Sequence, residues 1–194
     1  MTRVGLEDIA DRLGRKPPSL LGRAEDTRQA AVAAILRAAR GEPEVLLIRR
    51  AEHPRDPWSG HMAFPGGRHD PSDPDLLDTA RRETLEELGL DLGRHARLLG
   101  MLDEIEAIAR GRRTGIVIRP YVFALEEEPE LAPNAEVAEV VWAPLAPMLR
   151  GENATTLPYR RDGLDLVLPG YDVGGRVVWG LTYEMLQRLF SLLR

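Results

Sequence analysis

Apolar residues recur at helical spacing in three parts of the chain. Near the end, Leu186, Leu189, Phe190 and Leu193 follow the i, i+3, i+4, i+7 pattern, which predicts an amphipathic helix over Thr182–Leu193. A second helix is predicted over Leu76–Leu88, with Gly89 ending it, and its apolar stripe is formed by Leu77, Ala80, Thr84 and Leu88. Residues 1–23 predict a short amphipathic helix on Leu6, Ile9, Ala10 and Leu13, followed by a break at Pro17 and Pro18.

The segment Arg28–Arg40 can be interpreted in two ways. Its alanine content favours a helix. However, a turn at Gly41–Glu44 and a strand at Val45–Ile48 follow directly, so a β-hairpin is the preferred interpretation. Further strands are predicted at residues 98–102, 116–125 and 137–142, and loops at 52–74, 103–114 and most of 144–175. Strands and helices therefore mix in one α/β domain.

Composition narrows the class of protein. The 194 residues suffice for one domain, which we expect to span residues 24–194 with residues 1–23 as a helical extension. The net charge is -5, and such a mildly acidic chain disfavours a nucleic-acid partner. With no cysteine, disulfides, Cys-ligated zinc and thiol nucleophiles are excluded. No signal peptide or membrane-spanning run is visible, so we expect a cytoplasmic protein without a membrane partner.

Three acidic side chains gather on one side of the predicted helix 76–88. Glu83, Glu86 and Glu87 lie at helical spacings that bring their carboxylates close together, where they repel one another. A divalent cation would relieve the repulsion, and oxygen ligands favour Mg²⁺ or Mn²⁺. Arg82, four residues before Glu86, could orient it. The alternative is an ordinary charged surface helix.

The loop before this helix strengthens the metal interpretation. Phe64-Pro65-Gly66-Gly67 joined to Arg82-Glu83, Glu86-Glu87, Gly89 and Leu90 resembles the signature of the Nudix hydrolases. Asp73 stands where that signature has Glu, one residue too far from Arg82, and Thr84 replaces an apolar residue. The resemblance implies an α/β/α sandwich with a mixed sheet, the two long helices lying on opposite faces.

The resemblance also implies an activity and a set of ligands. Nudix hydrolases cleave a nucleoside diphosphate linked to another group X. Here the metal would be held by Glu83, Glu86, Glu87 and the carbonyl of Gly67, and the same three glutamates would be the catalytic residues. The general base would be a helix carboxylate or an acid of the 103–114 loop, Glu104 or Glu106.

Other segments resemble the coenzyme A diphosphatase subgroup. These are Leu46–Arg50 with Gly60 ahead of Phe64–Gly67, although Ala51 replaces a serine and one extra residue is present, and the Trp-Gly-Leu-Thr run Trp179–Thr182. The implied reaction converts coenzyme A or its thioesters to 3′,5′-ADP and 4′-phosphopantetheine or its acyl form.

Arginine is well suited to bind substrate phosphates because its guanidinium group matches the geometry of a phosphate. Arg50 and Arg55 lie just ahead of the glycine loop and are the candidate substrate-binding residues. If they read the 3′-phosphate, dephospho-coenzyme A should be the poorer substrate. Trp179 could stack on adenine, although a tryptophan before a terminal helix is more often part of the core.

Two alternatives remain for the function. One is hydrolysis of ADP-ribose or another nucleoside-diphosphate sugar, and the other is a non-catalytic, nucleotide-sensing Nudix domain. The retained helix carboxylates disfavour the second. The expected partner is a small nucleotide. The sequence is compatible with a homodimer but contains no feature that fixes the oligomeric state.

Overall fold

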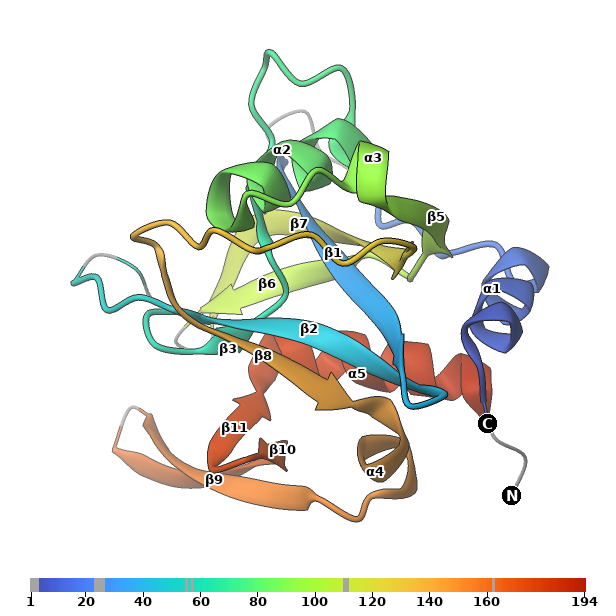
Figure 1. The fold of residues 1–194 in the computed structure, drawn as a ribbon. Helices are drawn as coiled ribbons and strands as arrows, with labels where there is room; N and C mark the ends of the chain where they lie inside the picture. The colour runs from blue at the N-terminus through green and yellow to red at the C-terminus, as the bar shows by residue number, and fades with distance from the viewer. Residues whose placement is uncertain (1–3, 23–26, 55, 57, 110–111, 162) are drawn as a thin grey trace.

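Strand β1 (Arg28–Ala39) lies in the middle of the main sheet and is buried on both faces over most of its length (Figure 1). The computed structural model describes residues 4–22, 27–54, 56, 58–109, 112–161 and 163–194. β1 forms an antiparallel hairpin with β2 (Glu42–Arg50) and runs parallel to β7 (Arg112–Leu125). The hairpin predicted at this point is confirmed.

The main sheet is mixed and has eight strands among the described residues. Its central order is β3-β2-β1-β7-β5, with β3 at Met62–Ala63 and β5 at Ala96–Met101. Three strands branch from this path: β4 (Gly66–Arg68) pairs with β1, β6 (Ile105–Ala109) with β7, and β8 (Val137–Pro144) with β2.

Helices cover both faces of this sheet. Along β1, Ala31, Ala33 and Ile35 pack toward helix α2 (Leu76–Leu88), in one core cluster with Ala80 and Leu88. The alternate residues face α1 (Leu6–Arg15) and α5 (Gly180–Leu193), because successive side chains of a strand point to opposite faces. The α/β/α sandwich and the placement of the two long helices on opposite faces are thus confirmed.

The N-terminal helix is part of this packing. Ile9 and Leu13 of α1 are buried in the same core cluster as Leu186 and Phe190 of α5. The helix at the start of the chain is therefore confirmed, and its apolar stripe completes the core on the α5 face. No helix of the described residues combines the length and apolar character that crossing a membrane would need.

Two of the expected loops are regular structure. Residues 103–114 contain β6 and the start of β7, which form an antiparallel ladder. Residues 144–175 contain α4 (Leu145–Arg150), β9 (Ala154–Arg161) and β10 (Leu164–Val173). β9 and β10 form a second sheet together with β11 (Arg176–Trp179). Within the predicted loop 52–74, β3 and β4 are short strands. A short helix α3 (Leu92–His95) follows Gly89.

Candidate active site

Helix α2 is fixed firmly at both ends. The Asp75 carboxylate accepts a hydrogen bond from the Asp78 amide at 2.9 Å, and Gly89 adopts the left-handed conformation that ends the helix. In the middle, the buried Thr84 hydroxyl donates to the Ala80 carbonyl at 2.7 Å, which explains how a polar residue is tolerated there. The helix therefore presents its glutamates from a rigid element.

The three glutamates of α2 differ in exposure. The Glu86 side chain is 55% exposed and that of Glu83 is 18% exposed, whereas Glu87 as a residue is only 3% exposed. Glu87 Oε2 accepts a hydrogen bond from the Gly66 amide at 2.8 Å. Glu83 lies so close to Gly67 that any side chain at position 67 would overlap its carboxylate. The glycine loop and the helix thus meet through these carboxylates.

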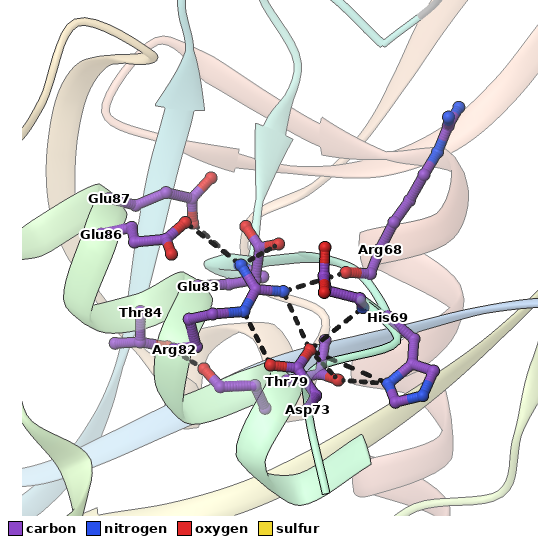
Figure 2. Close-up of polar contacts among 12 residues, drawn as sticks. Arg68, His69, Asp73, Thr79, Arg82, Glu83, Thr84, Glu86 and Glu87 are labelled. Atoms are coloured by element: carbon purple, nitrogen blue, oxygen red, sulfur yellow. Dashed lines mark hydrogen bonds and ion pairs between the residues drawn. The ribbon is translucent and has the colours of Figure 1, made fainter. Parts of the chain in front are cut away.

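Arg82 lies between the glutamates and the preceding loop, as Figure 2 shows. Its Nε and Nη2 donate to the two carboxylate oxygens of Asp73 at 2.8 and 3.0 Å. Its Nη1 lies 2.9 Å from Glu83 Oε1 and 3.2 Å from Glu86 Oε2. Arg82 therefore contacts Glu86, as its position four residues earlier in the helix led us to expect, and Asp73 holds Arg82 in place.

Burial and crowding set the proton affinities of this cluster. Burial raises the pKa of Glu87 to about 7, with a further contribution from Glu83, although the Gly66 amide and Arg50 oppose the shift. Burial also raises the pKa of Glu83, and Arg82 offsets part of that effect. By contrast, the hydrogen bonds from Arg82 hold the pKa of Asp73 well below its usual range. The negative charge of Glu83 and Glu87 is therefore incompletely compensated by the protein.

This donor set fits a hard divalent cation. The carboxylates of this cluster lie close together, and two of them, those of Glu83 and Glu87, have raised pKa values. A bound cation would stabilise their charged forms, and Mg²⁺ and Mn²⁺ prefer oxygen ligands. Within the described part of the chain, no three acidic or histidine side chains are already arranged as a complete ligand set. Arg82 Nη1 instead contacts both Glu83 and Glu86.

A pocket of about 380 Å³ adjoins the cluster where the main sheet divides. β1 pairs with β2 over residues 36–39 and with β4 over residues 30–32, so β2 and β4 diverge along β1. The pocket is lined from both branches, by Arg50 of β2 and by Gly66, Gly67 and Arg68 of β4. The pocket therefore extends to the glycine loop, which Glu83 and Glu87 contact at Gly67 and Gly66.

Arg50 lines the pocket with its guanidinium held by Asp56. Its Nε and Nη2 donate to Asp56 Oδ2 at 2.8 and 2.6 Å, and Asp56 Oδ1 accepts the Trp58 amide at 3.0 Å. Burial raises the pKa of Asp56, but the hydrogen bonds from Trp58 and Arg50 outweigh it and leave the pKa lowered. Arg50 also acts electrostatically on Glu87. The other candidate, Arg55, lies outside the described residues.

The two acids proposed as alternative bases are engaged elsewhere. Glu104 is buried, and its Oε1 accepts from Arg119 Nε and Nη2 at 2.9 and 2.6 Å while Oε2 accepts the Leu21 amide at 2.9 Å. Glu106 lies on β6, 3.0 Å from Arg113 Nη1. Glu104 therefore has an evident structural role in tying the N-terminal segment to the sheet.

Sequence reasoning missed two acids that belong to this region. Glu136, in the turn just before β8, raises the pKa of both Glu83 and Glu87, and its carbonyl accepts the Ala51 amide at 2.8 Å. Asp56 holds Arg50. The pairing of β2 with β8 brings Glu136 near, and no local spacing signals it.

Trp179 lines the pocket but is already packed against other rings. His61 lies 4.5 Å from it and Tyr159 5.5 Å, measured between ring centroids. Both contacts are tilted by about half a right angle, 50° and 47°. Trp179 is the last residue of β11, so the second sheet, to which Tyr159 of β9 also belongs, contributes to the pocket wall.

Comparison with known proteins places the chain in a family. The NUDIX domain profile matches residues 27–161. An uncharacterized protein of Schizosaccharomyces pombe is 42% identical over 59% of this chain, a match that spans 36% of that protein's own length. The mitochondrial coenzyme A diphosphatase NUDT8 of Homo sapiens is 34% identical over 84% of this chain and 69% of its own.

Solved structures agree with this placement at the level of the fold. A MutT/nudix family protein from Enterococcus faecalis superposes with a TM-score of 0.57 and 20% identity, covering 97% of this chain and 68% of its own. The domain match covers well over half of the sequence and includes the glycine loop and helix α2, which carry the site. The chain therefore belongs to the Nudix hydrolase family.

Proposed function

We propose that this protein is a metal-dependent diphosphatase that hydrolyses coenzyme A and its thioesters to 3′,5′-ADP and 4′-phosphopantetheine or its acyl form. The observation that carries the proposal is the meeting of Glu83 and Glu87 with the glycine loop beside an arginine-bearing pocket, with Glu86 linked to Glu83 through Arg82. The similarity to NUDT8 supports coenzyme A as the substrate.

The residues of α2 would hold the cation. Glu83, Glu86 and Glu87, with the Gly67 carbonyl, form the oxygen donor set for Mg²⁺ or Mn²⁺. When bound, such a cation neutralises the charge of the diphosphate and so favours attack on phosphorus. Arg82, anchored by Asp73, keeps Glu83 and Glu86 at a fixed position relative to the helix.

The chemical step is hydrolysis of one anhydride bond. A water oxygen forms a new bond to one phosphorus, the bridging P–O bond breaks, and the other phosphate leaves with the bridging oxygen. A carboxylate takes the proton from the attacking water. Glu86 is the most exposed of the three helix glutamates and is the best placed to reach water. Arg50 binds a phosphate oxygen at the pocket entrance.

A substrate screen tests this function. Coenzyme A, ADP-ribose, dinucleoside polyphosphates and NADH would each be incubated with the enzyme and Mg²⁺ or Mn²⁺, and products separated by chromatography. We expect coenzyme A to have the highest kcat/KM, yielding 3′,5′-ADP. Faster cleavage of ADP-ribose would instead assign the protein to the nucleoside-diphosphate-sugar hydrolases.

A further inference from the structure

The pocket beside the glycine loop has two chemically distinct parts. Its charged and titratable side chains lie among the exposed and half-buried lining residues, namely Arg50, His53, Asp56, His61 and Arg68. Its buried lining is mainly apolar and includes Ala30, Val32, Ala107, Ile116, Ile118 and Met185. Any group that reaches the buried part therefore meets mostly hydrocarbon.

The few polar groups near the buried part are already satisfied. The Thr182 hydroxyl donates to the Met62 carbonyl at 2.9 Å. The backbones at Ala30, Val32, Ile116 and Ile118 belong to strands paired within the main sheet. The Gly66 amide is engaged by Glu87. The buried end thus offers little hydrogen bonding to a ligand.

The shortage of free hydrogen-bonding groups in the buried part of the pocket favours one half of a nucleoside diphosphate linked to X over the other. A purine base carries several donors and acceptors around its ring, and a sugar carries several hydroxyls. Burying these groups without partners is costly, whereas an alkyl or acyl-thioester group gains from the same surroundings.

We propose that this pocket is the subsite for the X arm of the substrate, and that it selects an arm ending in an apolar group rather than a base or a sugar. The inference rests on the proposed diphosphatase function. Arg50, at the polar entrance and near Glu87, places the diphosphate between the pocket and the glutamates. The nucleoside then lies outside the buried lining.

Three substrates with the same adenosine diphosphate half test the proposal. These are hexanoyl-dephospho-coenzyme A, dephospho-coenzyme A and ADP-ribose. For the wild type we expect kcat/KM to fall in that order, by about tenfold or more at each step, because each step replaces apolar surface of the arm with less apolar surface.

The variant Ala30→Leu adds methylenes to the pocket wall. It should lower kcat/KM about tenfold or more for the hexanoyl substrate and leave ADP-ribose within about twofold. Ala138→Leu, an exposed position of β8, is the matched control and should change neither. Equal losses for all three substrates with Ala30→Leu would overturn the proposal, since they would place the shared adenosine half in the pocket.

A binding measurement keeps the inference separate from the activity. Trp58 and Trp179 line the pocket, so tryptophan fluorescence reports on its occupancy without turnover. S-hexanoylpantetheine, which has no diphosphate, should change the fluorescence saturably, and AMP should not. Should Ala30→Leu fail to fold, Val32→Thr replaces a methyl group of the pocket wall with a hydroxyl of similar size and should weaken this binding about threefold or more. Saturable binding of AMP but not of S-hexanoylpantetheine would refute the subsite, whereas failure of all substrates to react would refute only the proposed function.

Discussion

Asp73 accepts hydrogen bonds from Arg82 Nε and Nη2 with its two carboxylate oxygens, at 2.8 and 3.0 Å. The remaining guanidinium nitrogen, Arg82 Nη1, contacts Glu83 and Glu86. The acid that departs from the family signature therefore supports Glu83 and Glu86 indirectly, through Arg82. Its own side chain is 5% exposed, so the pair is well shielded on the Asp73 side.

Replacing this anchor should loosen the site and weaken the fold. We expect Asp73→Asn to lower the free energy of unfolding by about 1.5–3 kcal/mol at pH 7, because it removes hydrogen bonds between charged groups. The native pKa of Asp73 is lowered, so its stabilisation is present in full above the unfolded value of 3.8 and is lost progressively as the pH falls from there toward the lower native pKa. Urea unfolding from pH 7 to pH 3 would show the stability difference between the wild type and Asp73→Asn beginning to narrow. Asp165→Asn, on exposed β10, is the control and should be neutral. A free energy of unfolding of Asp73→Asn equal to that of the wild type at pH 7 would show that the Asp73–Arg82 pair does not stabilise the fold.

Glu87 should make the metal-free protein less stable as the pH rises. Its native pKa is raised from 4.5 to about 7, so the stabilisation it provides is complete below pH 4.5 and is lost as the pH rises to 7. The loss should amount to roughly 3 kcal/mol. Urea unfolding in EDTA should show this decline for the wild type and for Glu86→Gln, the exposed control, but not for Glu87→Gln. Saturating Mg²⁺ should reverse the decline at pH 7. A decline retained in Glu87→Gln would assign it to another group.

Asp56 should act on the substrate through Arg50. With Asp56→Asn, the guanidinium loses its charged partner, and we expect KM for coenzyme A to rise about tenfold with kcat within about threefold. Arg50→Ala should have the larger effect on KM, and a similar effect with dephospho-coenzyme A, because both substrates carry the diphosphate that Arg50 would bind. Arg55→Ala tests the second candidate in the same assay. Steady-state kinetics at fixed Mg²⁺ would measure these effects, and a fall confined to kcat would argue against a binding role.

Glu104 should prove structural rather than catalytic. Glu104→Gln leaves the charge of Arg119 uncompensated beside the N-terminal segment, so we expect the free energy of unfolding to fall by about 3–5 kcal/mol. Below its melting transition the variant should retain kcat within about threefold. A folded Glu104→Gln protein with kcat lowered a hundredfold would instead identify Glu104 as the general base.

The site helix could be predicted from sequence because its signals are local. Its apolar stripe and Gly89 fixed the boundaries Leu76–Leu88, and the glutamates follow from helical spacing. The strand identity of β1 could also be inferred despite its alanines, because the turn and β2 follow at once. Its small residues suit a strand covered on both faces.

The second sheet was missed because its prolines suggest loops. Pro158 lies in β9, which pairs only with β10 among the described strands, and an edge strand tolerates proline. Pro169 lies in β10 just outside the residues that pair with β11. Asp56 and Glu136 were missed for another reason: sheet pairing and a loop contact bring them to the site, and no periodicity encodes such contacts.

We expect the glutamates of α2 to bind the cation on which hydrolysis of coenzyme A depends. The most direct test is kcat/KM for coenzyme A with Mg²⁺ or Mn²⁺ for the wild type and Glu83→Gln, with Glu127→Gln on the exposed surface as control. We predict that kcat/KM falls by about three orders of magnitude or more for Glu83→Gln and does not fall for the control. EDTA should abolish turnover by the wild type. The free energy of unfolding of Glu83→Gln should equal or exceed that of the wild type. Full activity of folded Glu83→Gln, or wild-type turnover that survives EDTA, would show that catalysis does not depend on a cation held by Glu83.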